Sequence, residues 1–467
     1  MVGGGITGLA AAYRAVEVAR ERGIALELTL VEARERLGGT IATERTGGFL
    51  VEAGPDSFLS EKPWALALCR RLGVEDRLAR TDDRYRKVFV WRAGRLHPLP
   101  DGFQLLAPTR LAPFLASGLF SWAGKLRMAL DLVLPRGTVD DESLGAFVRR
   151  RLGREALERV AQPLVAGIYT ADPDDLSLAA ALPRFVELER RERSIILGLW
   201  RASRRAPQAG TSGARWSLFV TFRDGMEELV VALAERLPPG AVLTKHRVVG
   251  LERRGDRWRV ATAEGADLEA DRVVVATESH AAARMLRYVD PTLATLLADI
   301  PYASSATVTL GYRRAEVPRP LEAFGFVVPR TEGRALLACT FSSVKYPGRA
   351  PEGHVLLRGF VGGALNEAVL ELDDATLVMR ARDELRQAMG IMAAPVLTRV
   401  FRWPKAMPQY HVGHLARVET IERLVRALPG LDLAGGAYRG VGISDCVRSG
   451  EGAAERALGI RPADPRA

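Results

Sequence analysis

The stretch VGGGITGLAAAYRAVEVARERGIALELTLVE occupies residues 2–32 and contains the glycine pattern Gly3-x-Gly5-x-x-Gly8. The alanine-rich segment 9–20 predicts a helix, and segment 26–31 predicts a strand that ends at Glu32. Such glycines let a pyrophosphate approach the N-terminus of the next helix, and a carboxylate about 20 residues further on can accept hydrogen bonds from ribose hydroxyls. The order predicts a nucleotide-binding βαβ unit with contacts from Gly3, Gly5, Ile6, Thr7, Gly8 and Glu32.

The first strand of this unit is nearly missing, because only Met1 and Val2 precede the glycines. The first strand is the central one in such a sheet. A truncated gene start is therefore expected, rather than a sheet without its middle strand. An exposed turn glutamate remains the alternative interpretation of Glu32.

Composition places the chain among ordinary globular proteins. It has 467 residues, of which 48% are hydrophobic and 26% charged, enough for about two or three domains. Cys69, Cys339 and Cys446 are odd in number and lack CxxC spacing, so neither disulfides nor a zinc site is predicted and a reducing compartment is favoured. There is no secretory signal pattern and no apolar run of about 20 residues. We expect a cytoplasmic protein without a transmembrane helix.

The formal net charge is +10, which could favour anionic partners. Its basic clusters, such as residues 149–151, have no interleaved aromatic residues or zinc-finger context. Nucleic-acid binding is therefore not predicted. The stretch 108–136 mixes apolar and basic residues, which fits either helix core or a surface that contacts anionic lipid.

Two further glycine-rich stretches indicate FAD rather than NAD. Residues 36–40 add a turn near the pyrophosphate, and Arg36 offers it a cation. Residues 435–443 connect a predicted strand, 431–434, to a helix whose positive N-terminus would suit the N1–C2=O edge of a reduced flavin. Strands 242–251 and 272–276 complete a discontinuous FAD domain. These segments add Arg36, Gly38, Gly39, Thr40, Val248, Thr277, Gly436, Val441, Gly442 and Ile443 as candidate contacts.

Four separated motifs resemble those of the oxygen-dependent porphyrinogen oxidases of haem biosynthesis, and the resemblance covers essentially the whole chain. The motifs are Gly54-Pro55-Asp56-Ser57-Phe58; Ala166-Gly167-Ile168-Tyr169 with Leu176-Ser177; Phe401-Arg402-Trp403-Pro404 with Pro408-Gln409-Tyr410 and Gly413-His414; and Tyr438-Arg439-Gly440-Val441-Gly442. The resemblance implies aerobic six-electron oxidation of protoporphyrinogen IX or coproporphyrinogen III, with release of hydrogen peroxide. It also implies noncovalent FAD.

The same resemblance implies roles for particular residues. Flavin contacts would include Gly54, Pro55, Asp56, Ser57, Val248, Trp403 and residues 441–443, and the tetrapyrrole pocket would include Gly167, Gly325, Val327 and Phe360. Gln104 stands where some protoporphyrinogen oxidases carry a propionate-binding arginine, so Arg110, Lys62 or another cation could take that role. Four propionates need several cations, and coproporphyrinogen III is therefore favoured over protoporphyrinogen IX. No catalytic side chain is predicted, because flavin N5 would carry the chemistry.

The resemblance and the helix-period spacing of residues 102–205 predict an α/β protein with three parts. A discontinuous Rossmann-like FAD-binding domain would comprise residues 1–84, 211–290 and 395–467. An α-helical lobe, 103–205, would surround the substrate entrance and dock on the inner face of the cell membrane. A sheet-based substrate domain would comprise 85–102 and 291–394. Dioxygen and a tetrapyrrole are the expected reaction partners and ferrochelatase a candidate protein partner, and the oligomeric state is left open.

Three alternatives stay in view. A flavin amine oxidase shares the FAD domain, but it brackets its amine with aromatic side chains, whereas this chain has Val441-Gly442-Ile443 at the turn. A non-enzymatic FAD-fold carrier would not need an intact flavin site. His411 and His414 have the spacing of a metal pair but no carboxylate partner, so a packed turn is favoured over a metal site.

Overall fold

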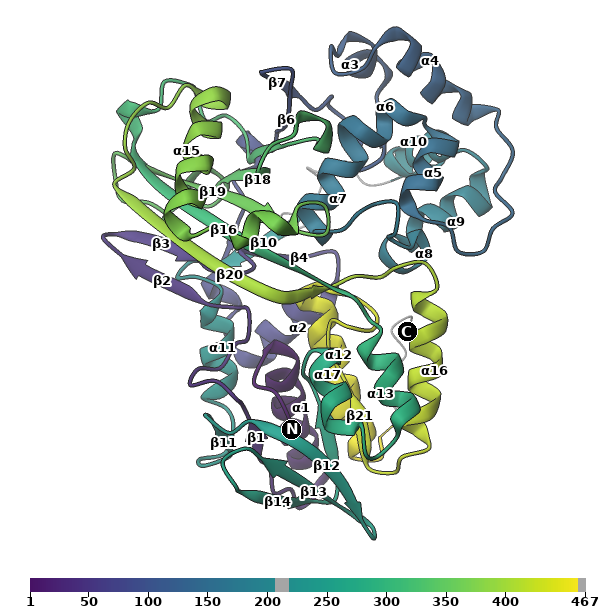
Figure 1. The fold of residues 1–467 in the computed structure, drawn as a ribbon, viewed down its shortest axis with the longest axis vertical. Helices are drawn as coiled ribbons and strands as arrows, with labels where there is room; N and C mark the ends of the chain where they lie inside the picture. The colour runs from purple at the N-terminus through teal and green to yellow at the C-terminus, as the bar shows by residue number, and fades with distance from the viewer. Residues whose placement is uncertain (206–217, 461–467) are drawn as a thin grey trace.

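The computed structural model describes residues 1–205 and 218–460, so residues 211–217 and 461–467 of the predicted FAD domain lie outside the described residues. Figure 1 shows three regions: a lower one that holds the N-terminus, an upper left one built on a large sheet, and an upper right one made of helices. The predicted α/β class is confirmed. The division into three domains by residue number stays a prediction.

The lower region is built on a small parallel sheet. Strand β1 (Leu30–Val31) pairs with β11 (Val242–Leu243), and β15 (Val273–Val275) pairs with β21 (Leu431–Leu433). Val2 bridges Val31 on one side and Val275 on the other, so it occupies the middle position of the sheet. The predicted strand 26–31 is thus shortened to two residues.

Helix α1 (Ile6–Arg22) follows Val2 and contacts the last helix of the chain, α17 (Ile443–Ala457). The two helices approach closely at Gly450, where an added Cβ would lie 2.2 Å from Thr7 O. The predicted helix 9–20 is therefore confirmed and extended at both ends. The remaining elements of the lower region are β2 (Thr43–Thr46), β3 (Phe49–Glu52), β4 (Phe58–Leu59), α2 (Pro63–Leu72), β5 (Leu78–Arg80), β10 (Phe219–Phe222), α11 (Glu227–Ala234), β12 (Val248–Arg254), β13 (Arg257–Thr262), β14 (Asp267–Ala270), α12 (Ser279–Leu286), α13 (Pro291–Ala298) and α16 (His414–Arg426).

One strand prediction in this region is wrong. The predicted continuous strand 242–251 is broken between β11 and β12, and Lys245 takes a left-handed φ of 59°. The amides of Lys245 and His246 donate to Arg34 O and Glu32 O, so the break forms a turn against the loop after β1. Hydrophobic alternation alone does not reveal such a tertiary turn.

The upper left region is a seven-stranded sheet in the order β20-β16-β19-β18-β17-β6-β7. All neighbouring strands are antiparallel except β17 and β6. Helix α15 (Asp374–Met389) packs on one face through Leu377, Ala381 and Leu385. The strands are β6 (Val88–Arg92), β7 (Arg95–Pro98), β16 (Tyr302–Arg313), β17 (Gly325–Val327), β18 (Leu336–Phe341), β19 (His354–Gly362) and β20 (Leu397–Pro408), and the short helix α14 (Ser342–Lys345) follows β18.

The upper right region is the helical lobe predicted from proline-interrupted helical periodicity. It contains the hairpin β8 (Phe103–Gln104) and β9 (Ala107–Pro108), and helices α3 (Leu111–Ala116), α4 (Trp122–Ala129), α5 (Leu144–Arg151), α6 (Arg154–Ala156), α7 (Gln162–Tyr169), α8 (Leu178–Ala181), α9 (Pro183–Glu192) and α10 (Ile195–Arg205). None of the helices in the described part of the chain has both the length and the hydropathy that crossing a bilayer requires.

A fully buried ion pair organises this lobe. Arg151 Nε donates to Asp131 Oδ1 at 2.6 Å, and neither side chain is exposed. The same guanidinium donates to Pro135 O and Arg193 O, while Asp131 Oδ2 accepts from Ser194 Oγ at 2.6 Å. One pair therefore joins the segment after α4, helix α5 and the start of α10.

Candidate active site

The first glycine turn presents an uncapped helix N-terminus. Gly5 is the N-cap of α1, and no side chain caps this helix. A Cβ added to Gly8 would lie 1.9 Å from Gly3 O, so the turn requires glycine there. A Cβ added to Gly5 meets nothing within 4 Å. The first amides of α1 thus border open space, which fits a pyrophosphate group.

Glu32 lies directly beside this turn, where the sequence places it. Its Oε2 accepts from Gly4 N at 2.7 Å, and its Oε1 accepts from Arg34 N at 2.8 Å. The carboxylate therefore stands at the end of β1, next to the glycines. That is the position from which a carboxylate contacts the ribose of a dinucleotide.

The second predicted turn, residues 36–40, packs against the first. Gly5 and Gly38 form a parallel β-bridge, and a Cβ on Gly39 would lie 3.3 Å from the Cα of Gly5. Arg36 donates to Gly39 O at 2.6 Å and to Ile41 O at 3.0 Å, so its guanidinium organises its own loop. Burial lowers the pKa of Arg36. The structure thus brings the two glycine turns together, and the guanidinium of Arg36 binds carbonyl groups of the second turn.

A second uncapped helix N-terminus closes the other end of the site. Gly442 is the N-cap of α17, again without a side-chain cap. A Cβ on Gly435 would approach both Thr277 O at 3.9 Å and Thr7 Oγ1 at 4.0 Å. The turn 435–442 therefore meets the first glycine turn and the end of β15. The N-termini of α1 and α17 thus lie at one site, and two such N-termini fit a ligand with two polar ends.

Residues 53–57 form a loop that a charged cluster holds in place. Trp403 Nε1 donates to Ala53 O at 2.9 Å, and the buried guanidinium of Arg358 donates to Gly54 O. Lys345 Nζ contacts Asp56 Oδ1 at 3.1 Å. Burial alone would raise the pKa of Asp56, but Lys345 and Arg358 outweigh it and hold that pKa at about 2.

The anchors of this loop come from different elements. Trp403 lies on β20, Arg358 lies on β19 and Lys345 ends α14. A Cβ on Gly54 would lie only 1.8 Å from Thr40 O, so the loop also touches the second glycine turn. Sequence reasoning found Trp403 but missed Lys345 and Arg358, since nothing in their local sequence marks them as partners of Asp56.

Three of the predicted pocket residues, Gly167, Val327 and Phe360, meet between the sheet and the helical lobe. Val327 belongs to the apolar cluster of the lobe, and Phe360 and Val441 pack against that cluster. A Cβ on Gly167 would lie 3.8 Å from Ala338 Cβ in the same cluster. Ile168, the next residue of α7, leaves half of its surface exposed. The structure therefore provides an apolar wall made of α7, the sheet and the turn before α17.

Gly325, Gln104 and Val248 are also predicted site residues, and their roles in binding stay predictions. Gly325 has a φ of 148°, and its missing Cβ leaves room for Cys339 O of the neighbouring strand, so this glycine serves sheet packing. Gln104 is exposed on the hairpin of the lobe. Val248 packs against the core around Trp258.

Of the two cations named as substitutes at Gln104, Lys62 lies at the start of α17. Its Nζ contacts Asp445 Oδ2 at 2.5 Å, and Asp445 is buried in the first turn of α17. Gly440 makes room for this carboxylate, because a Cβ added at Gly440 would lie only 2.4 Å from Asp445 Cγ. Arg110 is exposed and packs beside Gly102.

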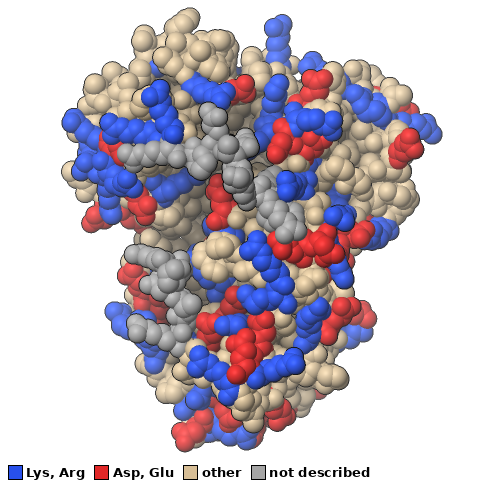
Figure 2. Space-filling model, turned by 180° about the vertical axis from the view of Figure 1, so that it is seen from behind, with Lys and Arg blue, Asp and Glu red and all other residues tan. Residues whose placement is uncertain are grey.

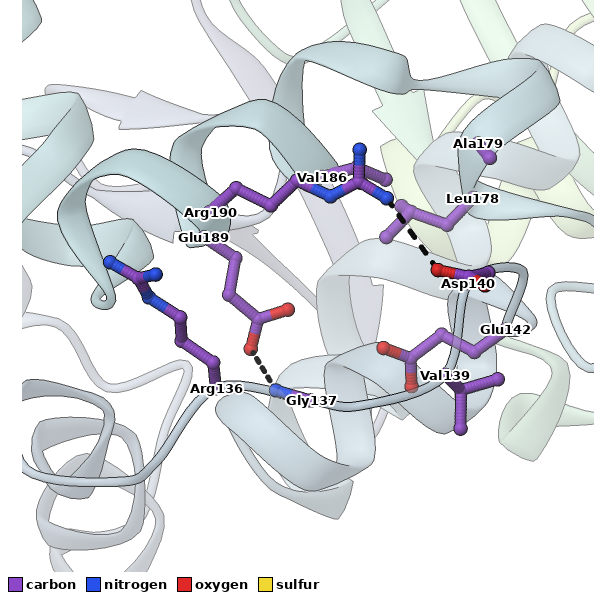
Figure 3. Close-up of a pocket in the computed structure, with 10 residues that line it drawn as sticks. All are labelled: Arg136, Gly137, Val139, Asp140, Glu142, Leu178, Ala179, Val186, Glu189 and Arg190. Atoms are coloured by element: carbon purple, nitrogen blue, oxygen red, sulfur yellow. Dashed lines mark hydrogen bonds and ion pairs between the residues drawn. The ribbon is translucent and has the colours of Figure 1, made fainter.

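A separate small cavity lies within the helical lobe. Figure 3 shows its lining, with Glu189 bound to the amide of Gly137 and Arg190 facing Asp140. Its volume is about 50 Å³, far below the size of a macrocycle. Within the ranges that the structure describes, no three His, Cys, Asp or Glu side chains gather as a metal site. His414 is buried and contacts Tyr438 O through Nε2 at 2.9 Å.

Known proteins resemble this chain along nearly its full length. The family described as flavin containing amine oxidoreductase matches residues 6–458. The coproporphyrinogen III oxidase of Bacillus subtilis is 39% identical over 98% of this chain and 97% of its own. Protoporphyrinogen oxidase 1 of Arabidopsis thaliana is 31% identical over 98% of this chain and 87% of its own. A solved structure of a candidate protoporphyrinogen oxidase from Exiguobacterium superposes with a TM-score of 0.85 at 32% identity, and the match covers 98% of each chain.

Proposed function

The chain belongs to the flavin containing amine oxidoreductase family, and from that premise we propose that it is an FAD-dependent oxidase that converts a porphyrinogen into a porphyrin. The observation that carries this proposal is the full-length similarity to proteins named for that activity. Coproporphyrinogen III is the favoured substrate. The relatives from Bacillus subtilis and Propionibacterium freudenreichii, at 39% and 38% identity, both carry its name.

The chain's own residues fit FAD. The amides of α1 would bind the pyrophosphate and Glu32 the adenosine ribose, while the N-terminus of α17 would face the N1–C2=O edge of the ring. When bound there, FAD would supply a hydride acceptor that dioxygen can reoxidise with formation of hydrogen peroxide. Cys446 packs against Gly436, and burial raises the pKa of its thiol to about 11, which supports noncovalent binding. We therefore expect denaturation to release the flavin from the protein.

Catalysis by this chain rests on positioning and on exclusion of water. A porphyrinogen that becomes a porphyrin loses six electrons and six protons, in three steps that each produce one peroxide. The four methylene bridges lose one hydrogen each and the pyrrole nitrogens lose two in total. Three of these hydrogens leave as hydride from methylene bridges, and the other three, two from nitrogen and one from the fourth bridge, leave as protons. The apolar wall formed by Gly167, Ile168, Phe360 and Val441 would hold the macrocycle and keep water away. Lys345, Arg358 and Trp403 would fix the loop 53–57, with Asp56, in place beside the cofactor.

The propionates of the substrate need cations at the rim of this wall. Lys62 fits that role, because its side chain is partly exposed while its ammonium group is held by Asp445 at the flavin turn. A propionate that reached Lys62 would share the ammonium with Asp445. Charge-assisted contacts of this kind contribute about 1.5–3 kcal/mol each, which is at least tenfold in specificity.

The helical lobe has a surface that fits reversible contact with anionic lipid. Leu111, Trp122, Leu126 and Val133 each expose two thirds or more of their surface. Figure 2 shows the upper left of the molecule, where α3 and α4 lie, as largely uncharged, with Lys and Arg side chains below it. We expect the protein to act in the cytoplasm with this surface at the inner face of the membrane. There, a ferrochelatase could receive the product.

The decisive test measures kcat/KM for porphyrin fluorescence on coproporphyrinogen III and protoporphyrinogen IX, with peroxide measured in parallel. We expect both to be oxidised with three peroxides per porphyrin, and coproporphyrinogen III to be the better substrate. Oxidation of a primary or secondary amine, with neither porphyrinogen consumed by the FAD-loaded protein, would establish an amine oxidase instead.

A substitution separates binding of FAD from folding. Gly5→Ala adds a Cβ into open space at an ordinary φ of −73°, so the fold should tolerate it. It should nevertheless weaken FAD about tenfold, because the methyl group occupies the pyrophosphate position. Gly118→Ala also adds a Cβ that meets nothing and serves as the matched control. Equal FAD affinity in the two variants would contradict the placement of the pyrophosphate.

A further inference from the structure

Tyr410 follows β20 and is almost completely buried, at 2% exposure. Its hydroxyl donates to Gly436 O at 2.5 Å and accepts from Gly440 N at 2.8 Å. One side-chain oxygen therefore spans the turn 436–440, which leads into α17. A turn with so many glycines has much conformational freedom, and this double contact removes part of it.

His414 holds Tyr410 in place and contacts the same turn. Its ring stacks on the Tyr410 ring, with centroids 4.1 Å apart and planes 15° apart. Its Nε2 lies 2.9 Å from Tyr438 O. A carbonyl oxygen can only accept, so Nε2 carries the proton and donates. Tyr410 and His414 together therefore bind three consecutive even-numbered positions of the turn: 436, 438 and 440.

The segment that carries these two residues is fixed from the other side by the helical lobe. Ser177 N donates to Tyr410 O at 2.8 Å, and Val412 N donates to Asp175 O at 3.0 Å. Gly413 N donates to Asp141 Oδ2 at 2.8 Å. The position of the glycine turn therefore depends on residues of the lobe, through Tyr410 and His414.

We propose that Tyr410 and His414 are positioning residues that hold the turn 436–440, and with it the N-terminus of α17, at the distance from the flavin ring that sets its affinity and its reduction potential. The inference rests on the proposed function in one respect, namely that FAD is the group at this turn. Neither side chain needs to touch the flavin. Each acts through the backbone of the turn.

The reasoning is electrostatic. Reduction places negative charge at the N1–C2=O edge of a flavin, and the N-terminus of a helix stabilises that charge only within about one turn. A turn released from Tyr410 leaves the α17 amides less well aligned. The reduced flavin then loses more stabilisation than the oxidised flavin, and the midpoint potential becomes more negative.

The experiment compares the FAD-loaded wild type with Tyr410→Phe, His414→Phe and the control Tyr312→Phe. Tyr312 is equally buried but lies in the core of the seven-stranded sheet, away from the turn. Phenylalanine at 410 keeps the ring and removes both hydroxyl bonds, while phenylalanine at 414 keeps the stack and removes the donor to Tyr438 O. The readouts are the FAD dissociation constant, the flavin midpoint potential and the melting temperature.

We expect Tyr410→Phe to bind FAD about tenfold more weakly, since two hydrogen bonds are lost, and to shift the potential of the retained flavin to more negative values. His414→Phe should change the FAD dissociation constant and the midpoint potential in the same directions, but by smaller amounts. Tyr312→Phe should change neither quantity. A merely structural role would lower the melting temperature and leave the potential unchanged. That result, or equal shifts in Tyr410→Phe and Tyr312→Phe, would overturn the inference.

None of these readouts uses a porphyrinogen, so the two proposals fail separately. If the wild type binds FAD and oxidises no porphyrinogen, while Tyr410→Phe and His414→Phe show the expected shifts, the proposed function is refuted and the role of Tyr410 is supported. If the wild type oxidises coproporphyrinogen III, and Tyr410→Phe leaves the midpoint potential unchanged, the proposed function is supported and the role of Tyr410 is refuted.

Discussion

Replacement of His414 by phenylalanine should remove a large part of the acid sensitivity of this protein. Burial lowers the pKa of His414 to about 4 from its ordinary 6.5. The hydrogen bond to Tyr438 O favours the imidazolium but is outweighed by burial, and the smaller effects of Arg417 and Arg439 also disfavour it. The folded state thus resists a proton that the unfolded chain accepts readily. His414 therefore contributes stability that is complete above about pH 6.5 and is lost as the pH falls towards 4.

The magnitude follows from the two pKa values. Linkage between pH 7.5 and pH 5 gives a loss of about 2 kcal/mol in the free energy of unfolding from this one group. His414→Phe has no such loss, although it should be less stable than the wild type at pH 7.5 because it lacks the donor to Tyr438 O. We therefore expect the stability gap between the two proteins to shrink by about 2 kcal/mol as the pH falls to 5.

The assay is guanidinium unfolding of the FAD-saturated proteins across this pH range. All other titrating groups, including His280 with its own lowered pKa, are present in both proteins and cancel in the difference. A gap that stays constant to within about 0.5 kcal/mol would refute the reasoning, because it would mean that His414 titrates alike in the folded and unfolded chains.

Three further predictions concern other parts of the chain. Asp56→Asn should lower the free energy of unfolding at pH 7 by about 2 kcal/mol, as measured in urea, and should remove the stability that the wild type loses between about pH 4 and pH 2, since the pKa of Asp56 is depressed to about 2. Arg151→Met should cost about 3–5 kcal/mol by leaving a buried carboxylate unpaired, and calorimetry that showed a loss below about 1 kcal/mol would contradict this. The double variant Trp122→Ser with Leu126→Ser should no longer float with phosphatidylglycerol vesicles at low salt, whereas equal flotation of variant and wild type would assign the apolar surface another role.

Much of the fold could be predicted from the sequence because its signals are local. The glycine pattern 3–8, the helix predicted at 9–20 and the carboxylate at 32 each depend on neighbouring residues, and all lie where predicted. The helical lobe also follows from periodicity along one stretch. The broken strand at Lys245 could not be predicted, since the turn depends on a distant loop.

The candidate site was predictable only in part, for the same reason. Glycines that border a ligand leave a pattern in the sequence, and the structure brings those of residues 3–8, 38–39, 54 and 436–442 together. The polar residues that hold them do not leave such a pattern. Lys345 lies 289 positions from Asp56, and Arg358 lies 304 positions from Gly54. Such pairings become visible only when the tertiary structure is known.

The close contact of α1 and α17 at Gly450 has a consequence for biosynthesis. The first glycine turn leaves the ribosome early, but the helix that faces it across the site begins only at Ile443. A nascent chain therefore carries half of its cofactor site, exposed and without its counterpart, through almost the whole of its synthesis. On the proposed function, we therefore expect flavin to be captured only after residues 443–457 have been synthesised.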